Sequence, residues 1–199
     1  MVRSRLVPAL CTTVLLTSLA VAGPGGAATT IAFGPGPQSS YRVATQPPAG
    51  HCHYRSTASH QPLPDPHCNP GARNPRVTPA TIHSTICVAG YTAAIRPPSA
   101  ITSAEKRLDA ASYHYTGSLR DAEYDHLIPL ELGGDPNDPR NLWVEPPSPG
   151  HRAGSGVYNP KDSIENEARS LVCSGSVSLT AMQQAIATNW TTALAAVGH

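Results

Sequence analysis

Four cysteines constrain the fold of this chain more than any other feature, and they are Cys52, Cys68, Cys87 and Cys173. The fifth cysteine, Cys11, lies in an N-terminal segment that has the pattern of a signal peptide. If that segment is removed on export, an even number of cysteines remains, which predicts two disulfides. Three pairings are possible. We expect Cys52–Cys68, which closes a local loop, and Cys87–Cys173, which ties the C-terminal helical region to the middle of the chain. Zinc is the alternative use of these thiols, but the chain has no Cys-x-x-Cys pair.

The N-terminal residues have the pattern of a secretory signal peptide. Arg3 and Arg5 supply a positive start, residues 6–22 are apolar or small, and Ala20-Val21-Ala22 forms a small-x-small cleavage site. The apolar run is short and rich in Thr and Ser, which disfavours a retained membrane span. We therefore expect residues 1–22 to be a signal peptide and the chain to be secreted, with no membrane contact after cleavage.

The rest of the chain divides into two parts by composition. Residues 23–50 are rich in Pro, Gly, Ser and Thr and carry one charged residue, Arg42. This composition predicts a disordered arm. Residues 51–199 have about the length of one domain. Because the chain has 21 prolines and one Phe, we expect that domain to be loop-rich, with a modest core that depends on the disulfides.

Helical periodicity is clearest near the C-terminus. One helix is predicted to begin at Asn159-Pro160-Lys161-Asp162 and to end before Gly175. A last helix is predicted near Thr180, where Thr180-x-x-Gln183 resembles a capping box. Its apolar stripe is expected to pack in the core and consists of Leu179, Met182, Ile186, Trp190 and Leu194. A further helix is predicted over residues 103–111, with Ser103 as its cap.

The segment that carries chemistry begins at Glu123, reaches Gly133-Gly134 and continues to Asn141-Leu142-Trp143. Its pattern predicts strand, turn and strand, with Asp125 next to His126. Phosphodiester hydrolysis needs a base for the attacking water and positive charge on the phosphate. A neutral imidazole, with a pKa near ~6.5, can take the proton, and a carboxylate can hold a hard divalent ion. The alternative is an ordinary surface Asp and a packed His, because neighbours in a strand point to opposite faces.

The Asp-His pair, the Gly133-Gly134 turn and Asn141 together resemble the core of HNH nucleases, in which two short strands and a helix surround one divalent metal ion. The resemblance implies an α+β fold with a ββα-metal core, a loop-rich, disulfide-stapled N-terminal part and C-terminal helices. It makes Asp125 a metal ligand, His126 the general base and Asn141 a catalytic residue that orients the loop. The expected ion is Mg²⁺, with Mn²⁺, Zn²⁺ or Ni²⁺ as alternatives.

A further metal ligand is expected near the start of the helix in such proteins. Asn159 stands there, although Asn before Pro also suits a helix N-cap without any metal. Asp162, Glu165 and His151 are the alternatives. Both carboxylates also suit the N-terminal end of a helix for dipole reasons alone, whereas His151 lies in a proline-rich loop.

Beyond this core, the chain resembles a group of exported bacterial HNH-like proteins over nearly the whole mature domain. The segments that carry the resemblance are Cys52-His53-Tyr54-Arg55, Leu63-Pro64-Asp65-Pro66, Thr85-Ile86-Cys87, Gly90-Tyr91, Arg96-Pro97-Pro98, Lys161-Asp162-x-x-Glu165 and Val172-Cys173-x-Gly175. The chain departs from the group at Arg169, where a His is common.

The resemblance implies a secreted, metal-dependent HNH-type endonuclease that acts on DNA or RNA as a monomer. The charge argues against tight binding of long duplexes: 14 Lys and Arg, of which Arg3 and Arg5 lie in the signal peptide, stand against 13 Asp and Glu. The second hypothesis is an exported domain that uses the same scaffold to bind the cell wall or a partner without catalysis. A third, a toxin, would require an immunity protein as its partner.

Overall fold

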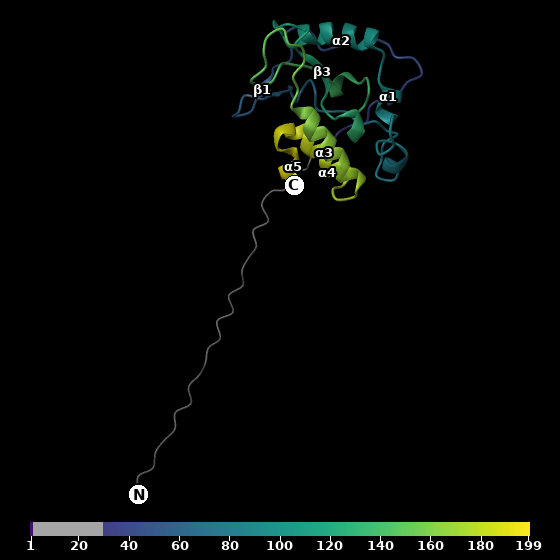
Figure 1. Cartoon of the computed structure of the whole chain (residues 1–199), viewed down its shortest axis with the longest axis vertical. Coiled ribbons are helices and arrows are strands. Elements are labelled where there is room, and N and C mark those ends of the chain that lie inside the picture. Colours follow the sequence, from purple (N-terminus) through teal and green to yellow (C-terminus); the bar gives the residue numbers. More distant parts are fainter. Residues whose placement is uncertain (2–29) are drawn as a thin grey trace. The chain divides into compact units, whose positions relative to one another are not determined.

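The computed structural model describes residue 1 and residues 30–199 (Figure 1). Apart from Met1, the predicted signal peptide of residues 1–22 lies outside the described residues. Residues 31–199 form one unit by their contacts. Within it, no helix has both the length and the apolar character needed to cross a membrane.

The unit combines short antiparallel strands with helices, which makes it an α+β fold, as predicted. The strands pair as β1 (Arg55–Ser56) with β2 (Pro62–Leu63) and β3 (Glu123–His126) with β4 (Leu142–Glu145). The α-helices are α1 (Tyr91–Ile95), α2 (Ser99–Ser112), α3 (Lys161–Cys173), α4 (Leu179–Asn189) and α5 (Ala193–Ala196). Four short 3-10 helices are η1 (Ile82–Ser84), η2 (Leu130–Leu132), η3 (Pro139–Asn141) and η4 (Trp190–Thr192).

The β3–β4 pair and the segment between its strands connect the two halves of the unit. Helix α2 packs against β3 and β4, whereas η2, which lies between the two strands in sequence, packs against α3 and α4 (Figure 1). The largest apolar cluster joins the C-terminal helices to η2, and its fully buried members include Leu132, Met182 and Ile186. The segment between the two strands is therefore fixed by the main core.

The helices at the C-terminus follow the periodicity closely. Helix α3 spans the predicted range, whereas the predicted last helix is divided into α4, η4 and α5. The predicted apolar stripe packs in the core, with Leu194 only partly buried. The predicted capping box is wrong: Ser178 caps α4, with its Oγ accepting from the Ala181 N–H at 3.2 Å. Gln183 is buried and donates to the Leu132 carbonyl at 2.8 Å, so its amide holds η2 instead. Helix α2 is longer than predicted, because it begins at Ser99.

Residues 31–50 do not form the disordered arm predicted for residues 23–50, of which residues 23–29 lie outside the described part of the chain. Residues 31–50 lie along the domain and pair with its buried carboxylates: the Gly36 N–H donates to Asp135 Oδ2 at 2.6 Å, and the Ala44 N–H donates to Glu105 Oε1 at 2.7 Å. The acceptors lie about 60 to 100 residues further along the chain. Local composition carries no signal for such pairs, which is why the sequence suggested disorder.

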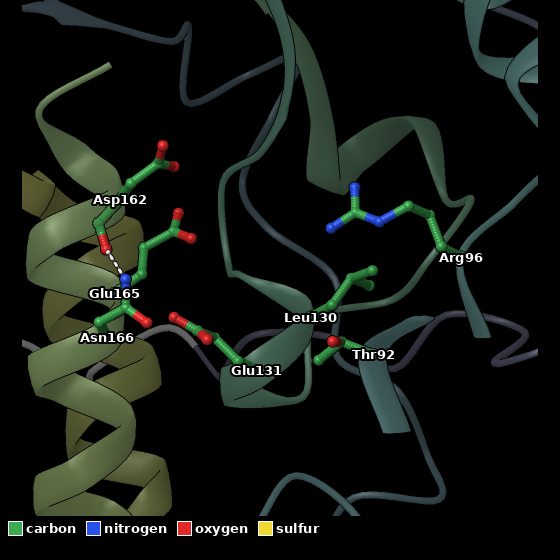
Figure 2. A pocket seen from close by; sticks show the side chains of 7 residues that line it. All are labelled: Thr92, Arg96, Leu130, Glu131, Asp162, Glu165 and Asn166. Atoms are coloured by element: carbon green, nitrogen blue, oxygen red, sulfur yellow. Dashed lines mark hydrogen bonds between the residues drawn. The ribbon is translucent and has the colours of Figure 1, made fainter. Parts of the chain in front are cut away.

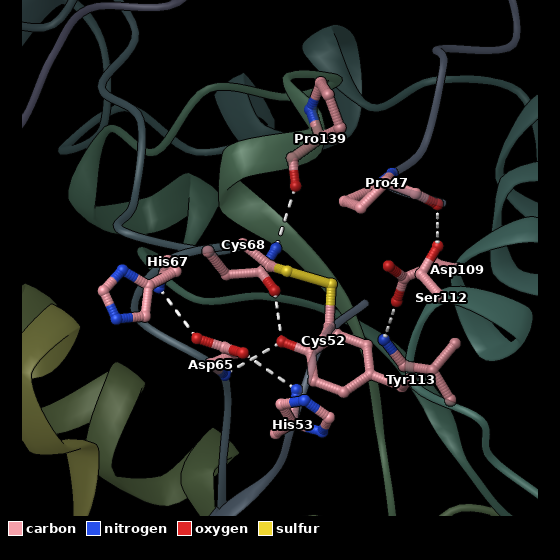
Figure 3. Close-up of a disulfide and its surroundings, with 12 residues drawn as sticks. Pro47, Cys52, His53, Asp65, His67, Cys68, Asp109, Ser112, Tyr113 and Pro139 are labelled. Atoms are coloured by element: carbon pink, nitrogen blue, oxygen red, sulfur yellow. Dashed lines mark hydrogen bonds between the residues drawn. A yellow bond between two sulfur atoms is a disulfide. The ribbon is translucent and has the colours of Figure 1, made fainter. Parts of the chain in front are cut away.

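Both predicted disulfides are confirmed. Cys52–Cys68 has an S–S distance of 2.04 Å, and Cys87–Cys173 has one of 2.02 Å. The first lies in a polar network in which Asp65 accepts from the His53 N–H at 2.8 Å (Figure 3). The second fastens the last residue of α3 to the loop after η1. Two disulfides are consistent with an oxidising compartment.

Candidate active site around His126

The loop after β3 is held in place by one asparagine. Asn141 is fully buried, and its Oδ1 accepts from the Ile128 N–H at 3.0 Å. Its Nδ2 donates to the carbonyl oxygens of Ile128 and Asp135, both at 3.0 Å. Such a side chain satisfies backbone groups that a strand pair leaves open at its end. The side chain of Asn141 thus ties the loop after β3 to the segment at Asp135.

The close approach within this loop requires glycine at position 134. A Cβ atom at Gly134 would lie 1.7 Å from the Ile128 carbonyl oxygen and 2.7 Å from Asn141 Nδ2. The preceding Gly133 has a φ of 74°, which is the left-handed region that glycine enters without cost. The Gly-Gly turn therefore lets the loop fold back onto the end of β3, directly after His126.

His126 is the last residue of β3, and its ring is buried. Its Nε2 lies 3.1 Å from the Pro136 carbonyl oxygen. Because a carbonyl only accepts, this contact assigns the proton to Nε2 and the lone pair to Nδ1. Within residues 30–199, Nδ1 has no hydrogen-bond partner. Burial lowers the pKa of His126 to about 4, so the ring is neutral at pH 7 and Nδ1 can accept a proton.

Asp125, the neighbour of His126, belongs to a different network. Its Oδ2 accepts from Trp143 Nε1 at 3.2 Å and from the ammonium of Lys161 at 2.8 Å. Trp143 is the residue opposite Asp125 on β4. As strand geometry predicts, adjacent side chains separate: the carboxylate reaches α3, and the imidazole reaches the 135–138 loop.

Lys161, the first residue of α3, is fully buried at the centre of the carboxylates. Burial alone would lower the pKa of its ammonium, but the carboxylates of Asp125, Glu165 and Glu145 outweigh burial and raise it. The ammonium is therefore charged. The i,i+4 spacing of Lys161 and Glu165 is a helical ion-pair pattern visible in the sequence. The contact with Asp125 has no such signal, and sequence reasoning missed it.

Asn159 lies just before α3, and its side-chain hydrogen bonds go to residues other than Asp125. Its Oδ1 accepts from the Lys161 N–H at 2.9 Å, as a capping side chain does. Its Nδ2 donates to Glu123 Oε2 at 2.9 Å and Glu145 Oε2 at 3.3 Å. These two glutamates face each other across β3 and β4, and burial raises the pKa of both. The amide of Asn159 thus joins two carboxyl groups that would otherwise repel.

The residues expected to hold a metal do not fit a directly bound ion as they are folded. The Oδ2 of Asp125 already binds an ammonium, and the Oδ1 of Asn159 already caps α3. Within residues 30–199, no group of three or more His, Cys, Asp or Glu side chains is arranged to hold a metal ion. Among the alternatives, His151 Nε2 contacts the Gly156 carbonyl at 2.8 Å within its own loop.

A pocket of about 250 Å³ lies between α3 and the end of α1 (Figure 2). Arg96, an exposed residue, lies on the opposite side of this pocket from α3. The remaining lining residues are Thr92, Leu130, Glu131, Asp162, Glu165 and Asn166. The charge of Arg96 reaches His126, because it contributes to the lowered pKa of that ring. The sequence identified Arg96 only through the wider resemblance.

No protein-family model matches this chain, and neither the curated proteins nor the solved structures gave a match. A function is therefore inferred from the geometry of residues 31–199 and from the motif that the sequence carries.

Proposed function

We propose that this chain is a secreted HNH-type endonuclease that hydrolyses phosphodiester bonds of DNA or RNA. The observation that carries the proposal is the state of His126, a neutral imidazole whose Nε2 is fixed by Pro136 and whose Nδ1 is free to accept a proton. The order of β3, a loop, β4 and α3 supports it, because this is the order of elements that the HNH resemblance implies.

In this proposal His126 takes a proton from the attacking water at Nδ1. A general base is most effective when its pKa lies near the working pH, and a pKa of about 4 is low for that task. A phosphodiester bound nearby brings negative charge, which raises the pKa of a histidine toward neutrality. The ring therefore becomes a stronger base when the substrate is in place than it is in the free protein.

Arg96 is the residue proposed to bind the phosphate. Its guanidinium is exposed and always charged, and its planar set of N–H donors matches a phosphate group. The carboxyl groups of Glu131, Asp162 and Glu165 in the same pocket oppose an anion, but burial raises the pKa of each of them. Partial protonation of these groups reduces the repulsion, so substrate binding should improve in mildly acidic solution.

The resemblance also implies a divalent ion, with Mg²⁺ as the expected one. Such an ion would neutralise the phosphate and stabilise the leaving oxygen. The resemblance assigns that ion to Asp125 and Asn159, but Asp125 Oδ2 and Asn159 Oδ1 both bind Lys161 in this structure, so these residues do not fit a directly bound ion as they are folded. No step of the proposed reaction is assigned to the ion.

The test is cleavage of plasmid DNA and of a structured RNA by the purified, oxidised protein. Each substrate is incubated with Mg²⁺, with Mn²⁺, with Zn²⁺ or Ni²⁺, and with a chelator. Cleavage of either substrate supports the proposal. The substitution Arg96→Ala should weaken cleavage, and it should raise KM more than it lowers kcat. Arg107→Ala, a change at an arginine outside the pocket lining, is the control.

A non-catalytic binding domain on the same scaffold is the second candidate. The nearly balanced charge of the chain and the engagement of Asp125 by Lys161 favour it. Absence of cleavage under every condition above, with the disulfides intact, would support this candidate instead. A toxin neutralised by an immunity protein would show the same cleavage as the first proposal, together with inhibition by that partner.

A further inference from the structure

Three oxygen atoms from two elements converge on one buried ammonium. Lys161 Nζ lies 2.8 Å from Asp125 Oδ2, 2.9 Å from the His126 carbonyl oxygen and 2.5 Å from Glu165 Oε1. An ammonium has three N–H donors, so each of them is used. The side chain of Lys161 has no exposed surface, which means that this arrangement is completely enclosed by protein.

Carboxylate and carbonyl oxygens are also the ligands that hard divalent ions prefer. The set around Lys161 contains two carboxylates and one carbonyl, held by β3 and by the N-terminal part of α3. A further carboxyl group lies nearby: Glu145 is 3% exposed, and within residues 31–199 its Oε1 has no hydrogen-bond partner. One ammonium therefore neutralises only part of the charge that these groups could carry.

We propose that Lys161 is a built-in cation, and that its ammonium occupies the position at which these oxygens would otherwise bind a divalent ion. The wild-type protein then has no divalent-ion site at Asp125. Removal of the ammonium should convert Asp125, Glu165 and the His126 carbonyl into such a site. This proposal does not depend on nuclease activity, because it concerns only what the oxygen atoms bind.

Through the same contacts Lys161 acts as a positioning residue for His126. One of its three N–H groups holds the carbonyl of His126 itself, and another holds the adjacent Asp125. The ammonium thus fixes the end of β3 to the first turn of α3. A bound ion at this position could hold the same oxygen atoms, which gives a direct way to replace one cation with the other.

The experiment measures Mn²⁺ binding to the full, oxidised protein in the absence of nucleic acid, by electron paramagnetic resonance. Wild type should show no Mn²⁺ binding that depends on Asp125. Lys161→Ala should gain an Asp125-dependent site and bind Mn²⁺ roughly tenfold or more tightly than the wild-type protein as a whole, because loss of the ammonium frees two carboxyl groups and a carbonyl to bind the ion. Its melting temperature should also rise with Mn²⁺, whereas that of wild type should not.

Two variants serve as controls. Lys161→Ala combined with Asp125→Asn should lose the gained site. Lys106→Ala removes another partly buried ammonium, one that donates to the carbonyls of Leu119 and Ala122 at 2.6 Å each and forms no ion pair within residues 31–199. This variant should lose stability without gaining Mn²⁺ binding, which separates the loss of a buried lysine from the opening of a cation site.

Two results would overturn the proposal. One is Mn²⁺ binding by wild type that Asp125→Asn abolishes, and this comparison needs no change at Lys161. The other is a Lys161→Ala protein that folds, as judged by its circular dichroism, yet binds Mn²⁺ no better than Lys106→Ala. Neither result bears on whether nucleic acid is cleaved, so failure here is distinct from failure of the proposed function.

Discussion

Among single residues, His126 has a protonation state that depends strongly on its burial. Burial lowers the pKa of its ring in the folded protein to about 4, against ~6.5 in an unfolded chain. A group with a depressed folded pKa contributes stability above its unfolded pKa, and this contribution is lost as the pH falls toward the folded pKa. His126 therefore stabilises the fold above about pH 6.5 and destabilises it progressively between that pH and about 4.

The same shift determines how cleavage should depend on pH. From the unperturbed pKa alone, activity would fall below about pH 6.5. With a folded pKa of about 4, His126 stays deprotonated down to about pH 5, so kcat/KM should not fall through protonation of this base until the pH is lower than that. A pH profile of kcat/KM, which reports the free protein, measures this. If kcat/KM instead falls with a midpoint near pH 6.5 on the acidic limb of the profile, the ring is not buried in the active protein.

Asp109 provides a test of burial at a second residue. Burial raises the pKa of Asp109 to about 7, although its Oδ2 accepts from the Val144 N–H at 2.6 Å. A raised carboxyl pKa favours the folded state at low pH, and this stability is lost as the pH rises from about 4 through about 7. Asp109→Asn cannot ionise. Its stability relative to wild type should rise by about 1–3 kcal/mol between pH 5 and pH 8, measured by urea unfolding.

An unchanged difference between Asp109→Asn and wild type across that pH range would contradict this account. Asp162→Asn is a suitable comparison, because Asp162 is less buried and lines the open pocket. Its pH dependence should be weaker than that of Asp109→Asn.

At the level of elements, predictions succeeded where the sequence carries a local pattern and failed where a contact joins residues distant in the chain. Helices α3 and α4 could be predicted because their apolar residues repeat at helical spacing and a glycine ends α3. The β3–β4 pair could be predicted from the motif. The capping box failed because Gln183 finds a buried partner on η2, about 50 residues away in sequence. Contacts of that kind leave no local pattern.

The two disulfides hold elements together to different extents. They join residues separated by 16 positions in Cys52–Cys68 and by 86 in Cys87–Cys173. On the loop-entropy estimate, the longer loop is worth about 1.5 kcal/mol more. Replacing Cys87 and Cys173 by Ser should therefore lower the free energy of unfolding more than the same change at Cys52 and Cys68. Urea unfolding of both double variants tests this, and the reverse order would contradict the account.

At the scale of the whole molecule, the candidate site was predictable in part. The motif indicated Asp125, His126 and Asn141, and the structure places Asn141 and His126 around one loop. The motif did not indicate that Asp125 would face Lys161, because that contact requires α3 to pack on the end of β3. For the same reason, the pairing of residues 30–50 with Asp135 and Glu105 could not be foreseen.

The measurement that tests the central claim most directly is the rate of nucleic-acid cleavage by His126→Gln. Glutamine keeps an N–H near the place of Nε2 that can donate to the Pro136 carbonyl, but it has no basic nitrogen. We predict a loss of roughly 10² to 10⁴ in rate, which is typical when a general base is removed. The exposed His83 provides the matched control, and His83→Gln should cleave at the wild-type rate. Cleavage by folded His126→Gln at the wild-type rate would contradict the account.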